Sequence, residues 1–278
     1  TDETIFATQN ASGNYVVPNT VQQCAVSAET NIDGISPISL SLETGGKPND
    51  SGYFPTNTSI TVKFGDNIIG TVTVISATVG SEDFPVTDWT TLTSLVDPDE
   101  GTDDPITIYV SGTITATEQA AFINRPVTII PKGNVKITRS SEKYVFSVNK
   151  NFSVRGEKGN TLTISDSSTQ NNYPLISCTQ VDVTVSFSNC IFENAKNTES
   201  YGSVLYVSGK QNISLENCEI KNNNGSSIFL SQEEDSSIKF VDCSFVNNDT
   251  DITVKECYSF TLSGLINISS LYFENSPI

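Results

Sequence analysis

The sequence predicts an all-β protein in which a parallel β-helix follows a small N-terminal antiparallel β domain. Short β-branched runs alternate with clusters of Asn, Gly, Ser and Asp along most of the 278 residues, which is typical of strands joined by turns. Long helical periodicity is nearly absent. In the C-terminal half, a ten-residue pattern recurs about every 25 residues, and such a period indicates the coils of a stacked β structure.

Residues 1–83 are expected to form the antiparallel domain, with a sandwich-like arrangement. Apolar and polar residues alternate at 38–42, 60–64 and 68–74, as they do in strands with one buried face. Turn-forming residues such as Gly, Pro, Asn and Asp separate these stretches, which favours hairpin connections.

A short helix should open the second domain, residues 84–278. Asp88 can serve as its N-cap, because a carboxylate accepts hydrogen bonds from the free N–H groups of a first turn. The apolar face would consist of Trp89, Leu92, Leu95 and Val96. We expect this helix to cover the first coil, since the open end of a stacked β structure needs protection.

The repeat consists of four aligned segments that begin at Val185, Ile213, Ile238 and Ile266. Each aligned column holds one chemical type. One apolar column is Phe192, Ile220, Phe245 and Phe273, a second holds Cys190, Cys218, Cys243 and Leu271, and the closing column is Asn194, Asn222, Asn247 and Asn275. A second strand recurs between the units at 175–176, 204–206, 228–230 and 252–254. Stacked coils lie about 4.8 Å apart, so we expect each column to form a ladder.

The Asn and Cys columns lead to two expectations. Asn tolerates the left-handed backbone conformation of a corner between strands and can bond to the Asn of the next coil. The cysteines should point inward as small hydrophobic residues and remain free thiols, because the coil spacing exceeds the Cβ separation that a disulfide prefers. Six cysteines in the chain are too few for a disulfide scaffold. Cys24, Cys178 and Cys257 receive no role.

The chain is strongly acidic, with 32 acidic and 15 basic residues and a net charge of −17. We therefore expect no nucleic-acid partner, because phosphate binding requires concentrated Lys and Arg. The absence of His excludes catalytic triads and metal sites that depend on it. No apolar run approaches the roughly 20 residues of a membrane span, so no membrane insertion of this chain is expected. The chain starts at Thr1 without an initiator Met, and we interpret it as a mature or excised fragment.

The repeats resemble those of the pectate-lyase-like right-handed parallel β-helix superfamily. More narrowly, they look like the FxxN repeats of polymorphic outer-membrane proteins and related bacterial surface adhesins. The segment 245–248 fits FxxN, and 220–223 fits with Ile in place of Phe, whereas the units that end at Asn194 and Asn275 depart at the last position. The resemblance covers about 84–278. It implies a right-handed β-helix in an extracellular or outer-membrane-associated protein, either passenger-like or lipid-anchored.

Few residues offer chemistry on such a scaffold. Enzymes of the resembling families use an Arg or Lys base near acidic residues, which points to Arg139 or Arg155, with Asp166 near by; exposed charges at coil edges are the alternative interpretation. Calcium is the one cofactor that the sequence suggests, through the loop carboxylates Asp99, Glu100, Asp103 and Asp104. A solvated loop is the alternative there. Tyr201, with Tyr206 and Tyr173, could form an aromatic surface for sugar binding.

These observations favour a secreted or cell-surface protein that binds without catalysis. A solenoid presents a long rigid face and needs no active site to do so. The expected partners are a host or matrix protein or a glycan, and no residue is assigned a catalytic role. Two alternatives remain open: a polysaccharide lyase or glycoside hydrolase that works in a lateral groove, and a structural spacer.

Overall fold

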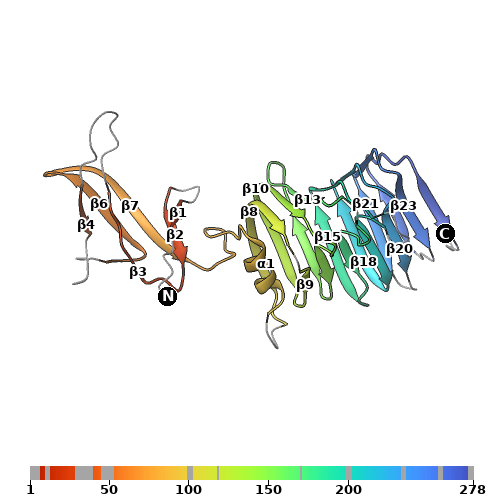
Figure 1. The fold of residues 1–278 in the computed structure, drawn as a ribbon, viewed down its shortest axis with the longest axis horizontal. Helices are drawn as coiled ribbons and strands as arrows, with labels where there is room; N and C mark the ends of the chain where they lie inside the picture. Colours follow the sequence, from red (N-terminus) through yellow and green to blue (C-terminus); the bar gives the residue numbers. More distant parts are fainter. Residues whose placement is uncertain are drawn as a thin grey trace. The chain divides into compact units, whose positions relative to one another are not determined.

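The computed structural model describes residues 7–9, 13–28, 40–44, 53–98, 103–117, 119–169, 171–197, 202–232, 236–255 and 259–274. The chain divides into two compact units, Thr1–Phe84 and Pro85–Ile278. Figure 1 shows the elements of both units.

The N-terminal unit contains a five-stranded sheet with the strand order β1-β2-β7-β6-β4 and a separate pair, β3 and β5. The strands are β1 (Thr8–Gln9), β2 (Tyr15–Pro18), β3 (Gln23–Cys24), β4 (Ser41–Thr44), β5 (Phe54–Pro55), β6 (Thr58–Phe64) and β7 (Asn67–Ala77). All neighbours are antiparallel except β2 and β7. The small core contains Val17, Phe54, Ile60 and Val74. The sequence correctly predicts an antiparallel β domain here.

Helix α1 (Trp89–Val96) opens the second unit and covers the first coil, as the sequence predicts. The side chain of Asp88 caps it by accepting a hydrogen bond of 2.9 Å from the N–H of Thr91. Trp89, Leu92 and Val96 are buried. The indole of Trp89 also donates to the carbonyl of Gln119 at 2.9 Å, which ties the helix to the chain beside the first coil.

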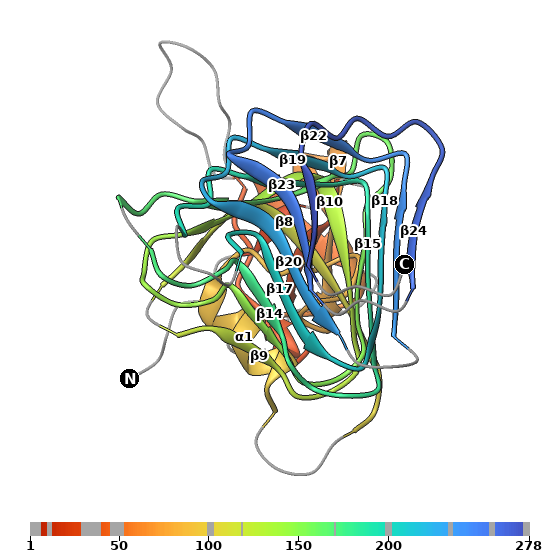
Figure 2. The same cartoon turned by 90° about the vertical axis from the view of Figure 1, so that its right-hand side faces the viewer.

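The second unit is a solenoid of parallel strands with three faces (Figure 2). Two long strands, β8 (Ile106–Ala116) and β10 (Val127–Arg139), bend across the first two faces. The first face continues with β12 (Phe152–Arg155), β15 (Val183–Ser188), β18 (Gln211–Glu216), β21 (Ser237–Val241) and β24 (Phe260–Ser263). The second face continues with β13 (Leu162–Asp166), β16 (Cys190–Glu193), β19 (Glu219–Lys221) and β22 (Ser244–Val246). The third face consists of β9 (Ala121–Ile123), β11 (Phe146–Val148), β14 (Ile176–Cys178), β17 (Leu205–Gly209), β20 (Ser226–Gln232), β23 (Thr250–Lys255) and β25 (Leu271–Glu274).

The interior ladders form in three of the four predicted copies. Phe192 pairs with Ile220, and Ile220 pairs with Phe245. All three side chains are buried. The second strand of each unit also stacks, since Ile176, Leu205, Ile228 and Ile252 pair in succession on the third face.

The predicted fourth copy is wrong. The strand that follows β21 on the first face is β24, which starts with Phe260 opposite Ile238. Phe273 lies on the third face, pairs with Val254 and is 42% exposed. The connection before this last coil is shorter than the earlier ones, and the apolar residues at 266–273 imitate the alternation of the true repeat. Asn275 lies outside the described residues.

The Asn corners are confirmed where they are described. Asn194, Asn222 and Asn247 have φ of 61°, 56° and 55°, and Asn247 Nδ2 donates to Asn222 Oδ1 at 3.4 Å. A second left-handed column, which the sequence did not reveal, consists of Asn189, Asn217 and Asp242, with φ between 50° and 51°. It turns the chain from the first face to the second.

Replacing Asn217 with Ala should lower the free energy of unfolding by about 1 kcal/mol, because a Cβ-bearing residue other than Asn or Asp is strained at positive φ. Asn217 is exposed, so little packing changes. Asn217→Gly is the matched control and should stay within about 0.5 kcal/mol of the wild type, since Gly accepts this conformation. Urea unfolding of the three proteins measures both effects, and equal losses in the two variants would contradict the assignment.

The prediction of free buried thiols is confirmed for Cys190, Cys218 and Cys243. Cys178 is also free and buried, in a third-face row between Val148 and Val207. Cys24 is half-buried, and its thiol donates to the carbonyl of Phe54 at 3.7 Å. Cys257 lies outside the described residues.

Candidate functional site

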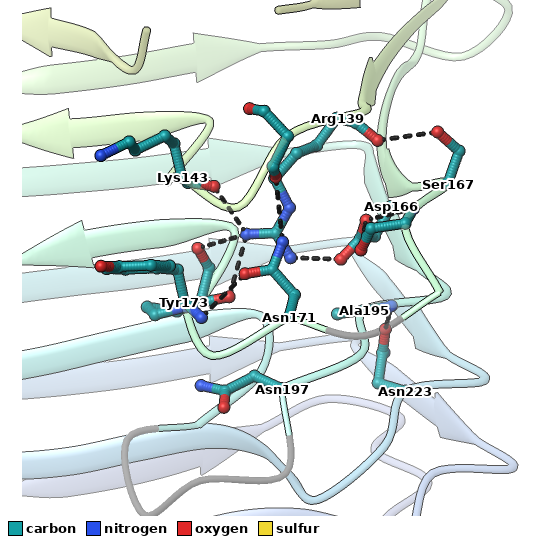
Figure 3. Close-up of polar contacts among 12 residues, drawn as sticks. Arg139, Lys143, Asp166, Ser167, Asn171, Tyr173, Ala195, Asn197 and Asn223 are labelled. Carbon is teal, nitrogen blue, oxygen red and sulfur yellow. Dashed lines mark hydrogen bonds and ion pairs between the residues drawn. The ribbon is translucent and has the colours of Figure 1, made fainter. Parts of the chain in front are cut away.

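The most connected polar group in the solenoid is a buried ion pair at the corner that follows the second face (Figure 3). Arg139 ends β10 and Asp166 ends β13, and the two residues are partners in the ladder. Both side chains are fully buried, and Arg139 Nη2 bonds to Asp166 Oδ2. Arg139 Nη1 donates to the carbonyls of Lys143, Tyr173 and Pro174, each at 2.9 Å.

The surroundings of the pair explain how two charges can remain inside. Asp166 Oδ1 accepts from the N–H of Ser168 at 2.8 Å and from its hydroxyl at 2.6 Å. Burial lowers the pKa of Arg139, while the hydrogen bond and negative charge of Asp166 act in the opposite direction. The pair therefore joins two coils and the long loop after β13.

Arg139 is not the exposed binding residue that the sequence suggested. Strand parity carried the missed signal: Val135, Ile137 and Arg139 occupy alternate positions of β10 and are all buried. Leu162, Ile164 and Asp166 show the same alternation in β13. An inward Arg and an inward Asp at the same ladder position predict an internal ion pair.

A column of buried amides extends the polar interior at this corner. Asn171 Nδ2 donates to the carbonyl of Ser141 at 3.0 Å. Two coils on, Asn223 Oδ1 accepts from the N–H of Ala195 at 2.9 Å, and Asn223 Nδ2 donates to Asn248 Oδ1 at 3.0 Å. These bonds replace the water that the turning backbone would otherwise need. They hold the corner in place and leave the chemistry of any ligand to the outer faces.

Arg155 is exposed at the end of β12, where it pairs with Ser188 in the ladder. It lies on the first face, whereas the Arg139–Asp166 pair ends strands of the second face. The two arginines and Asp166 therefore form no common site. In the part of the chain that the structure describes, no three acidic or cysteine side chains are grouped as metal ligands.

The proposed calcium loop is described only in part. Asp103 pairs with Lys150 at 3.0 Å and is largely exposed. The carbonyl of Asp104 accepts from Arg125 Nε at 2.8 Å and from Nη2 at 2.6 Å. Asp99 and Glu100 lie outside the described residues. The described half of the loop thus engages basic side chains.

The outer side of the second face carries opposite charges in contact. Glu193 receives Lys136 from two coils away at 2.8 Å and lies 4.0 Å from Lys221. Lys221 also pairs with Glu219 at 3.0 Å. The charges on this part of the face largely neutralise one another, which makes it a poor site for a charged ligand.

The first face presents a row of hydroxyls. The residues of this hydroxyl row are Thr107, Thr128, Ser153, Ser186 and Ser214, which pair in succession along the coils. Ser186 Oγ donates to Ser153 Oγ at 2.9 Å. The row is small-sided and uncharged.

The third face presents an aromatic row. Its members are Tyr206, Phe229 and Tyr272, with Thr253 between the last two in the ladder. The rings of Tyr206 and Phe229 are 5.8 Å apart and inclined at 32°, and Tyr272 is 58% exposed. The ammonium of Lys255 lies 5.7 Å from the Phe229 ring centroid, within the range of a cation–π contact.

Of the three tyrosines that the sequence suggested, only Tyr206 belongs to this row. Tyr173 packs edge-on against Tyr144, with ring centroids 5.2 Å apart, at the Arg139 corner. Tyr201 lies outside the described residues. Gly202, at φ +75°, sits so close to Phe229 that a Cβ at position 202 would lie 2.9 Å from the Phe229 Cβ. A side chain there would disturb the row.

The comparisons agree with this architecture. A family model described as "Right handed beta helix region" matches residues 123–270, more than half of the chain. No curated protein matches the chain, and no solved structure matches it. Among the described residues, no helix is long and apolar enough to cross a membrane. The match spans the coils from β10 to β24, and the chain belongs to the right-handed β-helix family.

Proposed function

We propose that this chain is a non-catalytic binding protein of the extracellular space or cell surface, whose aromatic row holds a glycan chain. The supporting observation is the row itself. Outward positions of a solenoid strand need no large aromatic side chains for folding, and solvent-facing aromatic groups that lie in line mark interaction surfaces. Tyr206, Phe229 and Tyr272 occupy such positions.

The geometry of the row fits a linear sugar polymer. Coils stack about 4.8 Å apart, so the ladder offers ring faces at regular intervals along the solenoid axis. The C–H faces of pyranose rings pack on aromatic rings, and hydroxyls of Thr253 and Tyr206 lie in the same row to accept or donate hydrogen bonds. Lys255 supplies one positive charge beside Phe229, which would favour a glycan that carries carboxylates at intervals.

The remaining features of the proposal follow from the sequence. An adhesin-like protein with FxxN repeats, displayed by a lipid anchor or as a passenger, would meet glycans or matrix proteins of a host. Its net charge of −17 disfavours dense polyanions as ligands. Calcium at 99–104 would be a structural ion of the loop before β8, separate from the aromatic row.

Binding of a glycan array by the wild type and by Tyr206→Ala and Phe229→Ala variants tests the proposal. We expect each substitution to weaken binding about tenfold, which corresponds to about 1.4 kcal/mol, because each removes one stacking surface. Ser186→Ala, in the hydroxyl row of the first face, is the matched control and should leave binding unchanged.

Two outcomes would overturn the proposal. One is glycan binding that survives both aromatic substitutions while Ser186→Ala reduces it, which would place the ligand on the first face. The other is release of reducing sugars from any bound polysaccharide, which would make the protein an enzyme. A chain that binds no glycan and no matrix protein on the array would act as a spacer.

A further inference from the structure

The coil of residues 259–274 leaves one end of the solenoid uncovered. β24 and β25 are terminal strands, because each has a ladder partner on one side only. Apolar side chains of this coil are correspondingly exposed: Leu262 by 41%, Leu265 by 86%, Leu271 by 36% and Phe273 by 42%. Their equivalents one coil earlier, such as Phe240 and Val254, are completely buried.

The same coil is free of charge. Residues 259–273 contain no Asp, Glu, Lys or Arg, although 17% of the whole chain is charged. Proteins usually protect an open strand edge with charged side chains, prolines or a covering element. This edge has none of the charged protection, so its composition is that of a surface that becomes buried.

The other end of the solenoid shows what burial requires. There α1 lies over the first coil and contributes Trp89, Leu92 and Val96, all buried. Because α1 occupies that end, a second molecule cannot extend the solenoid from it by strand pairing. Association through strand edges is therefore open only at the coil of residues 259–274.

From these observations we infer that the 259–274 coil is a self-association surface, on which two copies of this chain meet end to end. A copy offers the same neutral, apolar surface, whereas surfaces elsewhere on two chains of charge −17 repel each other. A twofold axis perpendicular to β24 brings β24 of both copies together as antiparallel neighbours, so the free backbone groups can pair. Such a contact closes on itself and forms a dimer.

Sedimentation velocity of the 278-residue chain over about 1–100 µM tests this inference. We expect a monomer–dimer equilibrium and a limiting mass of twice 30.0 kDa. Leu265→Lys places a charge on the most exposed apolar residue of the coil and should raise the dissociation constant at least tenfold, with unchanged folding because Leu265 is 86% exposed. Val181→Lys is the control, since Val181 is 54% exposed on an earlier coil, and it should leave the equilibrium unchanged.

Hydrogen exchange supplies a second readout. The amides of β24 and β25 should exchange more slowly at the dimeric concentration than in the Leu265→Lys variant. A monomer throughout the concentration range, a dimer that persists in Leu265→Lys, or a mass that grows beyond the dimer would each overturn the inference. Glycan binding by monomeric Leu265→Lys separates this question from the proposed function, because Leu265 is not part of the aromatic row.

Discussion

Replacing Arg139 with Met should lower the free energy of unfolding by about 3–5 kcal/mol, the usual effect of breaking a buried ion pair by removing one partner. The substitution leaves the Asp166 carboxylate inside the solenoid without its counter-charge. It also removes the donor of three bonds to backbone carbonyls. Since the pair joins two coils to the loop after β13, the loss should be felt by the solenoid as a unit.

Two further variants make this expectation specific. Lys136→Met removes the partner of Glu193 on the outer face, where Lys136 is 44% exposed, and should cost less than about 1 kcal/mol. The double variant Arg139→Met/Asp166→Leu removes both buried charges and should recover part of the loss, but not all of it, because the three carbonyls still lack a donor. Urea unfolding followed by circular dichroism measures the series. A loss below about 1 kcal/mol in Arg139→Met would show that the pair does not hold the corner.

The fold was predictable from the sequence because the ladders of a solenoid repeat one residue type at one position. The columns through Phe192 and Cys190 repeat at 28 and then 25 residues, and the structure stacks them as expected. The last coil escaped prediction because spacing depends on corner loops, which no ladder constrains. Phe260 follows Ile238 by only 22 residues, and the alignment selected Ile266 instead.

The candidate site was less accessible to sequence reasoning. An Arg at a strand end is usually solvated, and only its pairing with Asp166 in the adjacent coil stabilises Arg139 in the interior. The aromatic row was hidden for another reason. Tyr206 and Phe229 occupy outward positions of strands whose inward neighbours, Leu205 and Ile228, are also large and apolar. A continuous apolar run does not show which residues face the solvent.

Raising the pH from about 9 to about 12 should destabilise the protein through its buried thiols. Burial raises the pKa of Cys178 to about 12. Burial also raises the pKa of Cys218, and contact with the Cys218 thiol, followed by burial, raises the pKa of Cys243. In the unfolded chain these thiols ionise near pH 8.5. The stabilisation from a raised pKa is complete below the unfolded value and is lost as the pH rises towards the folded one.

Each such thiol should therefore reduce the free energy of unfolding by about 1.4 kcal/mol per pH unit in this window, and the three together by about 4 kcal/mol per unit. Cys178→Val is the informative variant, because Val148 and Val207 already occupy the flanking positions of its row. It should match the wild type within about 1 kcal/mol at pH 7 and lose stability less steeply above pH 9, by about 1.4 kcal/mol per unit. Tyr and Lys residues also titrate there, but they are common to both proteins and cancel in the difference. Parallel stability curves for the two proteins between pH 9 and 12 would mean that Cys178 ionises as readily in the folded state as in the unfolded one, and that the interior of the third face admits water.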